Sequence, residues 1–192
     1  MLCSQFKEVQ VQRIFLLLII LFFLIGCASS QPPIEALSQM SPQELNQLSV
    51  KLWKNGSYTD PELALKYANL ASEKDPKYGR AYYTKGFAYY NLKQYELSIE
   101  NFTKAIEIDP HIAESYNGRG WVYGTTDDYE MALQDFSKAI EIDHNYALAY
   151  NNRGYTYLHL KDNIKACADY KKACDLGDCR QYRYRKSIGT CK

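Results

Sequence analysis

The sequence lacks most of the features that mark catalytic or nucleic-acid-binding proteins. Its 23 Lys and Arg residues nearly match its 22 Asp and Glu residues, so the net charge gives no indication of a polyanionic partner. It contains three His, no C-x-x-C, C-x-x-C-H or H-E-x-x-H motif, and no Gly-rich phosphate-binding loop. We therefore expect no metal, no cofactor and no nucleic-acid partner, and a protein that is not an enzyme.

The sequence also lacks an apolar run long enough for a stable transmembrane helix, but a shorter run lies near its N-terminus. Residues 14–25 are all apolar, whereas spanning a bilayer takes about 20 residues. Lys7 and Arg13 place basic residues before the run, which is the arrangement of an export signal. A buried helix is the alternative, and the polar sequence behind the run disfavours it.

A more specific signal follows this run. Residues 24–27, Leu-Ile-Gly-Cys, resemble the lipobox of bacterial lipoproteins, in which the Cys is joined to diacylglycerol and the chain is cut just before it. The resemblance implies a signal peptide at 1–26 and a lipidated Cys27 with a tether at 27–44. Several acyl chains would hold the protein stably at a membrane. The implied location is the bacterial cell envelope facing the periplasm, and Ala28 favours the outer membrane if the host is Gram-negative.

A period of 34 residues dominates the rest of the chain. Asp-Pro pairs at 75–76 and 109–110 end helices, because the residue before Pro is disfavoured in the helical conformation. The pattern predicts helical hairpins, each with an apolar flank that only a neighbouring hairpin can bury. The recurring residues are Gly86, Gly120 and Gly154; Tyr82, Tyr116 and Tyr150; Tyr89, Tyr123 and Tyr157; Phe102, Phe136 and Tyr170; and Ala71, Ala105, Ala139 and Ala173.

This pattern resembles the tetratricopeptide repeat, or TPR. The resemblance implies an all-α fold, a superhelical solenoid of helix-turn-helix repeats with a C-terminal capping helix. We expect repeats at 45–78, 79–112, 113–146 and 147–180, the first of them divergent, and a cap at 181–192. The recurring Tyr residues then pack helices together, so most of the 18 Tyr residues indicate a repeat rather than a catalytic or stacking set.

In TPR proteins the first helix of each repeat lines a concave groove, and the resemblance transfers these groove positions to this chain. Phe87, Trp121 and Tyr155 form a ladder of aromatic residues at 34-residue spacing, with amide residues beside it. Rings supply contact area and amides satisfy backbone groups, which suits an extended peptide or a partner helix. The alternative is that the three rings only cover the hairpin interfaces. The predicted groove residues are Tyr83, Thr84, Phe87, Asn117, Trp121, Asn151, Asn152 and Tyr155.

Four of the six Cys residues lie near the C-terminus. Cys167 and Cys174 are seven residues apart on one expected helix, about 10 Å along its axis, which is too far for a disulfide. A chain that folds back at residues 176–178 would bring Cys191 beside Cys167 and leave Cys174 and Cys179 flanking the turn. We therefore favour the pairs Cys167–Cys191 and Cys174–Cys179. The alternative is that the cysteines of the expected helix are buried thiols.

These features together predict a non-enzymatic scaffold that is anchored at a membrane and binds a protein or peptide partner in the cell envelope. The architecture resembles TPR lipoproteins that act as assembly factors for envelope complexes. Two alternatives remain open: a redox-responsive envelope protein that uses the C-terminal cysteines, and an intracellular TPR adaptor with an uncleaved signal anchor. Residues 180–192 carry five basic and no acidic residues, which indicates a solvated cap or a contact for anionic lipid or an acidic partner.

Overall fold

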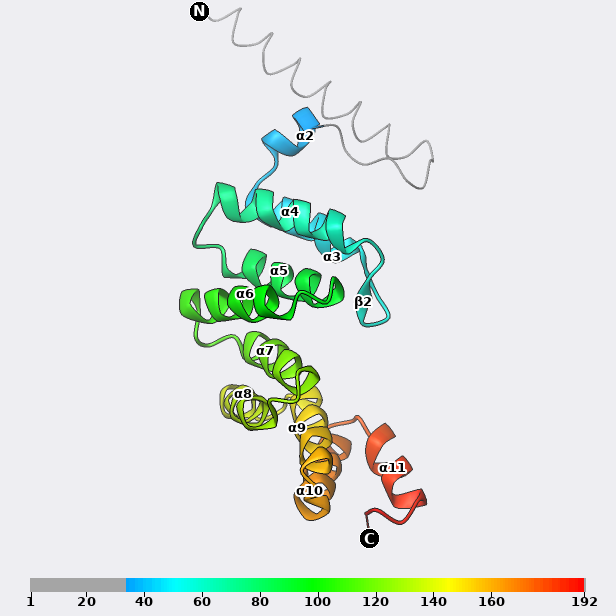
Figure 1. Cartoon of the computed structure of the whole chain (residues 1–192). Helices are drawn as coiled ribbons and strands as arrows, with labels where there is room; N and C mark the ends of the chain where they lie inside the picture. Colours follow the sequence, from blue (N-terminus) through cyan, green and yellow to red (C-terminus); the bar gives the residue numbers. More distant parts are fainter. Residues whose placement is uncertain (1–33, 192) are drawn as a thin grey trace, which may run out of the picture. The chain divides into compact units, whose positions relative to one another are not determined.

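The computed structural model describes residues 34–191. The predicted signal peptide, Cys27 and the first part of the tether lie outside the described residues. The chain divides into two units between Gln39 and Met40. Among the described residues, the first unit contributes one helix, α2 (Ile34–Gln39), and the second contributes helical hairpins and one short β-hairpin (Figure 1).

Successive helices of the second unit pack as antiparallel pairs, and each pair packs against the next through α4 and α5, α6 and α7, and α8 and α9. This arrangement confirms the predicted all-α solenoid of helix-turn-helix repeats. A last helix, α11 (Arg180–Ser187), packs against α10 as a cap (Figure 1). The pairs are α3 (Pro42–Lys51) with α4 (Pro61–Lys74), α5 (Gly79–Asn91) with α6 (Tyr95–Ile108), α7 (Ala113–Thr125) with α8 (Tyr129–Ile142), and α9 (Ala147–His159) with α10 (Asn163–Asp175).

The buried core residues recur at the same positions of successive repeats. One large ring is almost completely buried in each of α6, α8 and α10, namely Phe102, Phe136 and Tyr170. A Cβ atom at Gly86 would lie 2.9 Å from the Phe102 ring, and one at Gly118 would lie 2.5 Å from it. Glycine is required at both positions because the Phe102 ring of α6 lies against the backbones of α5 and α7.

The turn between the two helices of a hairpin is built alike in three repeats. Lys93, Asp127 and Lys161 occupy the same repeat position, and each has a positive φ, of 59°, 63° and 62° respectively. Residues with side chains adopt this left-handed conformation at a modest energetic penalty. The next helix then begins with a side-chain cap in two of these turns, where Asp128 accepts from the Met131 N–H and Asp162 accepts from the Lys165 N–H.

A bidentate ion pair also recurs in two successive repeats, α7 with α8 and α9 with α10. The Arg119 guanidinium donates two hydrogen bonds of 2.8 Å to the Asp135 carboxylate and a third, of 3.0 Å, to the Thr103 hydroxyl. Arg153 and Asp169 form the same pair one repeat later. Each pair joins the first helix of a repeat to its second helix. These pairs leave no signal in the sequence, because a spacing of 16 residues crosses a turn and follows no single-helix period.

The predicted divergent repeat contains an element that the sequence analysis missed. After α3, strands β1 (Trp53–Lys54) and β2 (Ser57–Tyr58) pair antiparallel, with Trp53 opposite Tyr58. The two loop residues, Asn55 and Gly56, both have positive φ, as a type I′ hairpin turn requires. Asn-Gly between two short runs of strand-forming residues is a strong hairpin signal and would have found this element.

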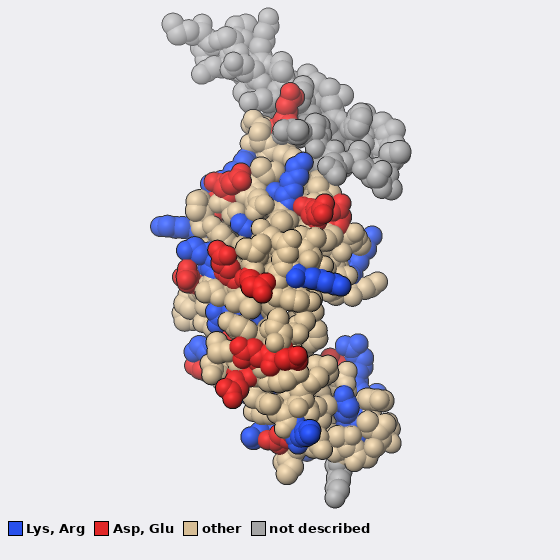
Figure 2. All heavy atoms as spheres, viewed as in Figure 1, with Lys and Arg blue, Asp and Glu red and all other residues tan. Residues whose placement is uncertain are grey.

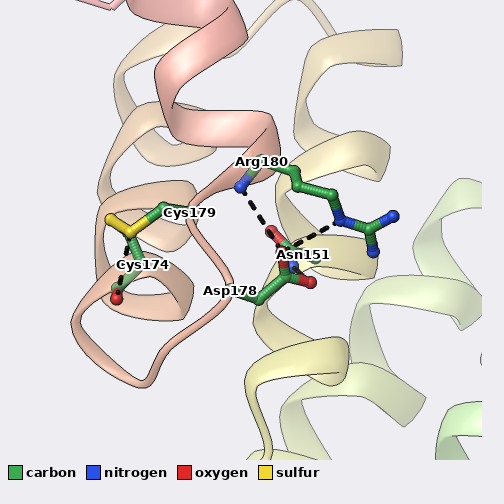
Figure 3. Close-up of a disulfide and its surroundings, with 5 residues drawn as sticks. All are labelled: Asn151, Cys174, Asp178, Cys179 and Arg180. Carbon is green, nitrogen blue, oxygen red and sulfur yellow. Dashed lines mark hydrogen bonds and ion pairs between the residues drawn. A yellow bond between two sulfur atoms is a disulfide. The ribbon is translucent and has the colours of Figure 1, made fainter.

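Two disulfides connect α11 and the C-terminal segment to α10. They join Cys167 to Cys191 and Cys174 to Cys179, the pairs favoured from the sequence. Figure 3 shows the second disulfide at the turn between α10 and α11. Beside it, the Asn151 amide donates a 2.9 Å hydrogen bond to the Asp178 carboxylate, which links α9 to the start of the cap.

Candidate functional site: the concave groove

The first helices of the repeats line an open cavity of about 560 Å³, which we call the larger cavity. The first repeat, with its β-hairpin, provides one wall, and α5, α7 and the start of α9 provide the others. The lining residues are Val50, Trp53, Gly56 and Tyr58 from the first repeat, Arg80, Tyr83, Thr84, Phe87 and Tyr90 from α5, Asn117 and Trp121 from α7, and Tyr146, Leu148 and Asn152 at α9.

The β-hairpin wall is fixed by rings and by one hydrogen bond. The Trp53 ring lies edge-on to the rings of Tyr58 and Phe87, at centroid distances of 4.9 and 5.1 Å. The Tyr58 N–H donates a 2.7 Å hydrogen bond to Oδ1 of Asn91 at the end of α5. The hairpin is therefore held against α5, where its residues line the larger cavity.

The structure brings six of the eight predicted groove residues into the larger cavity, and it places the other two elsewhere. Tyr155 lines a separate, smaller cavity of about 260 Å³, which also includes Trp121 and Asn152. Asn151 lies at neither cavity, because its amide is bonded to Asp178 at the cap. The six residues in the larger cavity are Tyr83, Thr84, Phe87, Asn117, Trp121 and Asn152.

The three residues of the aromatic ladder differ in exposure. Trp121 and Tyr155 are 37% and 46% exposed, although both are large aromatic side chains. Phe87 is only partly exposed, and its ring packs edge-on to Trp53, Tyr83 and Phe102 at 5.0–5.1 Å. Trp121 and Tyr155 are therefore available for a partner, while Phe87 also covers the hairpin interface.

Two buried amides lie beside the exposed rings. The Asn152 side chain donates a 2.9 Å hydrogen bond to Oδ1 of Asn117, which joins α9 to α7 at the floor of the groove. Both side chains are at least 90% buried. Their mutual bond fixes the orientation of the two amides, so the polar floor is preorganised next to the rings.

The larger cavity is close to neutral. Among the described residues that line it, Arg80 is the one charged side chain, and its guanidinium lies 5.6 Å from the Tyr83 ring centroid. Burial, and then the nearby carboxylate of Glu114, raise the pKa of Tyr83 to about 12. Burial likewise raises the pKa of Tyr58 and of Tyr146. All three phenols are therefore protonated at neutral pH and can donate hydrogen bonds.

Within residues 34–191, no helix combines the length and hydrophobicity needed to cross a bilayer. The same part of the chain brings no three His, Cys, Asp or Glu side chains into an arrangement that could hold a metal ion. Figure 2 shows basic and acidic side chains interspersed over the visible face of this part, which agrees with the balanced composition.

Stacked helical hairpins with a concave groove define the class of helical-repeat solenoids. Within this class, the chain carries tetratricopeptide repeats. Residues 79–112 and 113–146 each match one family model described as a tetratricopeptide repeat, and residues 136–168 match a second model with the same description. No curated protein sequence shows significant similarity to the chain.

Solved structures show the same fold at low sequence identity. A thermophilic TPR protein from Thermus thermophilus superposes with a TM-score of 0.67 and 22% identity, over 78% of this chain and 84% of that one. PilF from Pseudomonas aeruginosa gives a TM-score of 0.67 and 20% identity, over 77% and 69%. The first TPR domain of Spaghetti (RPAP3), solved with the HSP90 peptide SRMEEVD, gives 0.55 and 22%, over 59% and 94%.

Proposed function

We propose that this protein is a non-enzymatic scaffold that holds a protein or peptide partner in its concave groove. TPR proteins generally mediate protein–protein interactions, and one structural neighbour was solved with a peptide bound. The observation that carries the proposal is the exposure of Trp121 and Tyr155 beside the fixed amides of Asn117 and Asn152. Exposed rings next to oriented polar groups are typical of the energetic centre of an interface.

The larger cavity suits bulky apolar side chains of such a partner. Its volume of about 560 Å³ lies within the range of small-ligand pockets. Its walls are mainly aromatic and aliphatic, and they include the protonated phenols Tyr83 and Tyr146. A peptide segment that inserts one or two apolar side chains and bonds its backbone to the polar floor would use all of these groups.

Replacing Trp121 and Tyr155 together by Ala is expected to reduce partner capture at least tenfold, because buried interface aromatics commonly contribute about 2 kcal/mol or more. The measurement is quantitative affinity capture from membrane extracts of the native host, with the bound proteins identified by mass spectrometry. The helical spectrum should be unchanged, because both side chains are substantially exposed.

Ile164→Ala is the matched control, since Ile164 is 85% exposed and lines neither cavity. It should capture as much partner as the unaltered protein. Equal capture by the Trp121 and Tyr155 double variant would contradict the proposed groove function.

We further propose that the scaffold is anchored in the cell envelope through lipidated Cys27, with an envelope complex as the assembly it serves. The lipobox-like residues 24–27 support this anchor. The disulfides Cys167–Cys191 and Cys174–Cys179 support an exported location, because disulfides persist in oxidising compartments. If the host is Gram-negative, Ala28 favours the outer membrane.

Mass spectrometry of the mature N-terminus tests the anchor directly. The proposal expects a chain that begins at Cys27 and carries diacylglycerol and an amide-linked acyl group. A chain that retains Met1, or a cleaved chain with an unmodified Cys27, would contradict it.

A further inference from the structure

The smaller cavity differs in chemistry from the larger one. It lies where the α7–α8 turn approaches the end of α9, and four of its rings are those of Trp121, Tyr129, Tyr155 and His159. The His159 ring stacks on Tyr129 at 5.1 Å and lies edge-on to Tyr155 at 4.6 Å. The one carboxylate at this cavity is Asp127, and no Lys or Arg of the described residues lines it.

Hydrogen bonds fix the acidic side of this cavity. The Tyr129 hydroxyl donates to Oδ1 of Asp127, and the same hydroxyl lies 3.0 Å from Nδ1 of His159. Since the Tyr129 proton is given to Asp127, the contact with His159 is completed by an N–H at Nδ1. The bond to Asp127 also raises the pKa of Tyr129, so the phenol stays neutral.

The turn does not require an acid at this position. Lys93 and Lys161 occupy the equivalent positions of the adjacent repeats with nearly the same φ as Asp127. The backbone of the turn therefore accepts a basic residue. The conformation of the turn therefore does not explain why the acidic residue Asp127 lies at the smaller cavity.

We propose that the smaller cavity is a subsite for a cationic side chain, a Lys or Arg of the bound partner. The cation would lie against the rings of Trp121 and Tyr155 and pair with the Asp127 carboxylate. Aromatic rings attract cations through their quadrupole, and a carboxylate adds a charge-assisted hydrogen bond. This inference rests on the proposed function of the groove and specifies the chemistry of its partner.

The two cavities together indicate which side chains of a bound segment lie at each end of the groove. They share Trp121 and Asn152, so a segment in the groove crosses from one cavity to the other. The larger cavity carries the cation Arg80 among apolar walls, and the smaller one carries the anion Asp127. A partner that presents apolar side chains toward the β-hairpin and a basic side chain toward the α7–α8 turn matches both.

The test uses Nα-acetyl-lysine N-methylamide as the probe and the indole N–H signals of the two Trp residues as the readout. In NMR titrations of the full chain with its disulfides oxidised, the probe should shift the Trp121 signal. Trp53 lies in the larger cavity and should not respond. The norleucine analogue, which lacks the ammonium group, should shift Trp121 at least tenfold less at the same concentration.

Asp127→Lys should abolish the response of Trp121, and Asp127→Asn should weaken it several-fold. Glu130→Lys makes a matched charge change at an exposed residue that does not line the cavity, and it should retain most of the response. An undiminished shift in Asp127→Lys with an unchanged helical spectrum, or an equal shift with norleucine, would overturn the subsite.

Partner capture separates this inference from the proposed function. If Asp127→Lys captures the partner normally while the Trp121 and Tyr155 double variant does not, the groove function stands and the cation subsite is wrong. If the double variant captures normally, the groove function itself is wrong, whatever the probe shows.

Discussion

Asp135→Asn is expected to lower the free energy of unfolding by about 3 kcal/mol. The Asp135 and Arg119 side chains are 6% and 17% exposed, and two hydrogen bonds of 2.8 Å join them. Removing one partner of a buried ion pair leaves the other charge without compensation, which typically costs about 3–5 kcal/mol. We expect the lower end of this range because Arg119 retains some exposure and keeps its hydrogen bond to Thr103.

The chain supplies a natural control for this prediction. One repeat earlier, the same two positions carry Lys85 and Asn101. The double variant Arg119→Lys with Asp135→Asn should therefore recover at least half of the lost stability in urea denaturation followed by circular dichroism. If the single and double variants are equally unstable, the stabilisation comes from the individual side chains and not from the pair.

Replacing Cys167 and Cys191 by Ser is expected to release α11 from the solenoid. None of the residues of α11 is buried, so few apolar contacts hold the helix in place. The disulfide closes a segment of 24 residues, which the chain-entropy model values at about 3 kcal/mol. Amides of α11 should lose their protection in hydrogen exchange, while those of α5 to α8 should keep theirs, because a solenoid transmits stability mainly between neighbouring repeats.

Replacing Cys174 and Cys179 by Ser provides the comparison. That disulfide closes only five residues, so the same model gives a smaller effect, about 2 kcal/mol. Equal loss of protection in both variants would contradict the expectation that the Cys167–Cys191 disulfide stabilises α11 more than the Cys174–Cys179 disulfide does. If reduction at the potential of the envelope releases α11 in the native protein, the redox-responsive alternative is favoured over a purely structural role for these disulfides.

The sequence predicted the parts of the fold that one repeat defines by itself. Gly86 and Phe102 recur with a 34-residue period. The Phe102 ring packs against Gly86, and this contact lets α5 and α6 approach each other. The sequence pattern therefore predicts how the two helices pack. The cysteine pairs followed from helical rise and the position of one turn. Polar contacts between helices were harder to foresee. The Arg119–Asp135 pair joins two helices across a turn and has no signature within either one.

The sequence likewise predicted only part of the candidate groove. The repeat offset placed Trp121 in the groove, but it also assigned Asn151, which contacts the start of the cap instead. The reason is that the last repeat, α9 with α10, is followed by α11 and not by another repeat. The β-hairpin wall was missed because the apolar positions around it fit a divergent helical repeat. Asp127, His159 and their contact with Tyr129 depend on how two turns approach each other, and no local pattern encodes that.

Site-specific photo-crosslinking tests the central claim, that the concave groove holds a protein partner, most directly. A photo-reactive phenylalanine analogue would be incorporated in place of Tyr155, which is exposed at the smaller cavity, and separately in place of Ile164, which is exposed outside both cavities. On irradiation of intact host cells, the account predicts a discrete crosslinked partner from position 155 and none from position 164. No crosslink at position 155, or the same crosslinks from both positions, would contradict it.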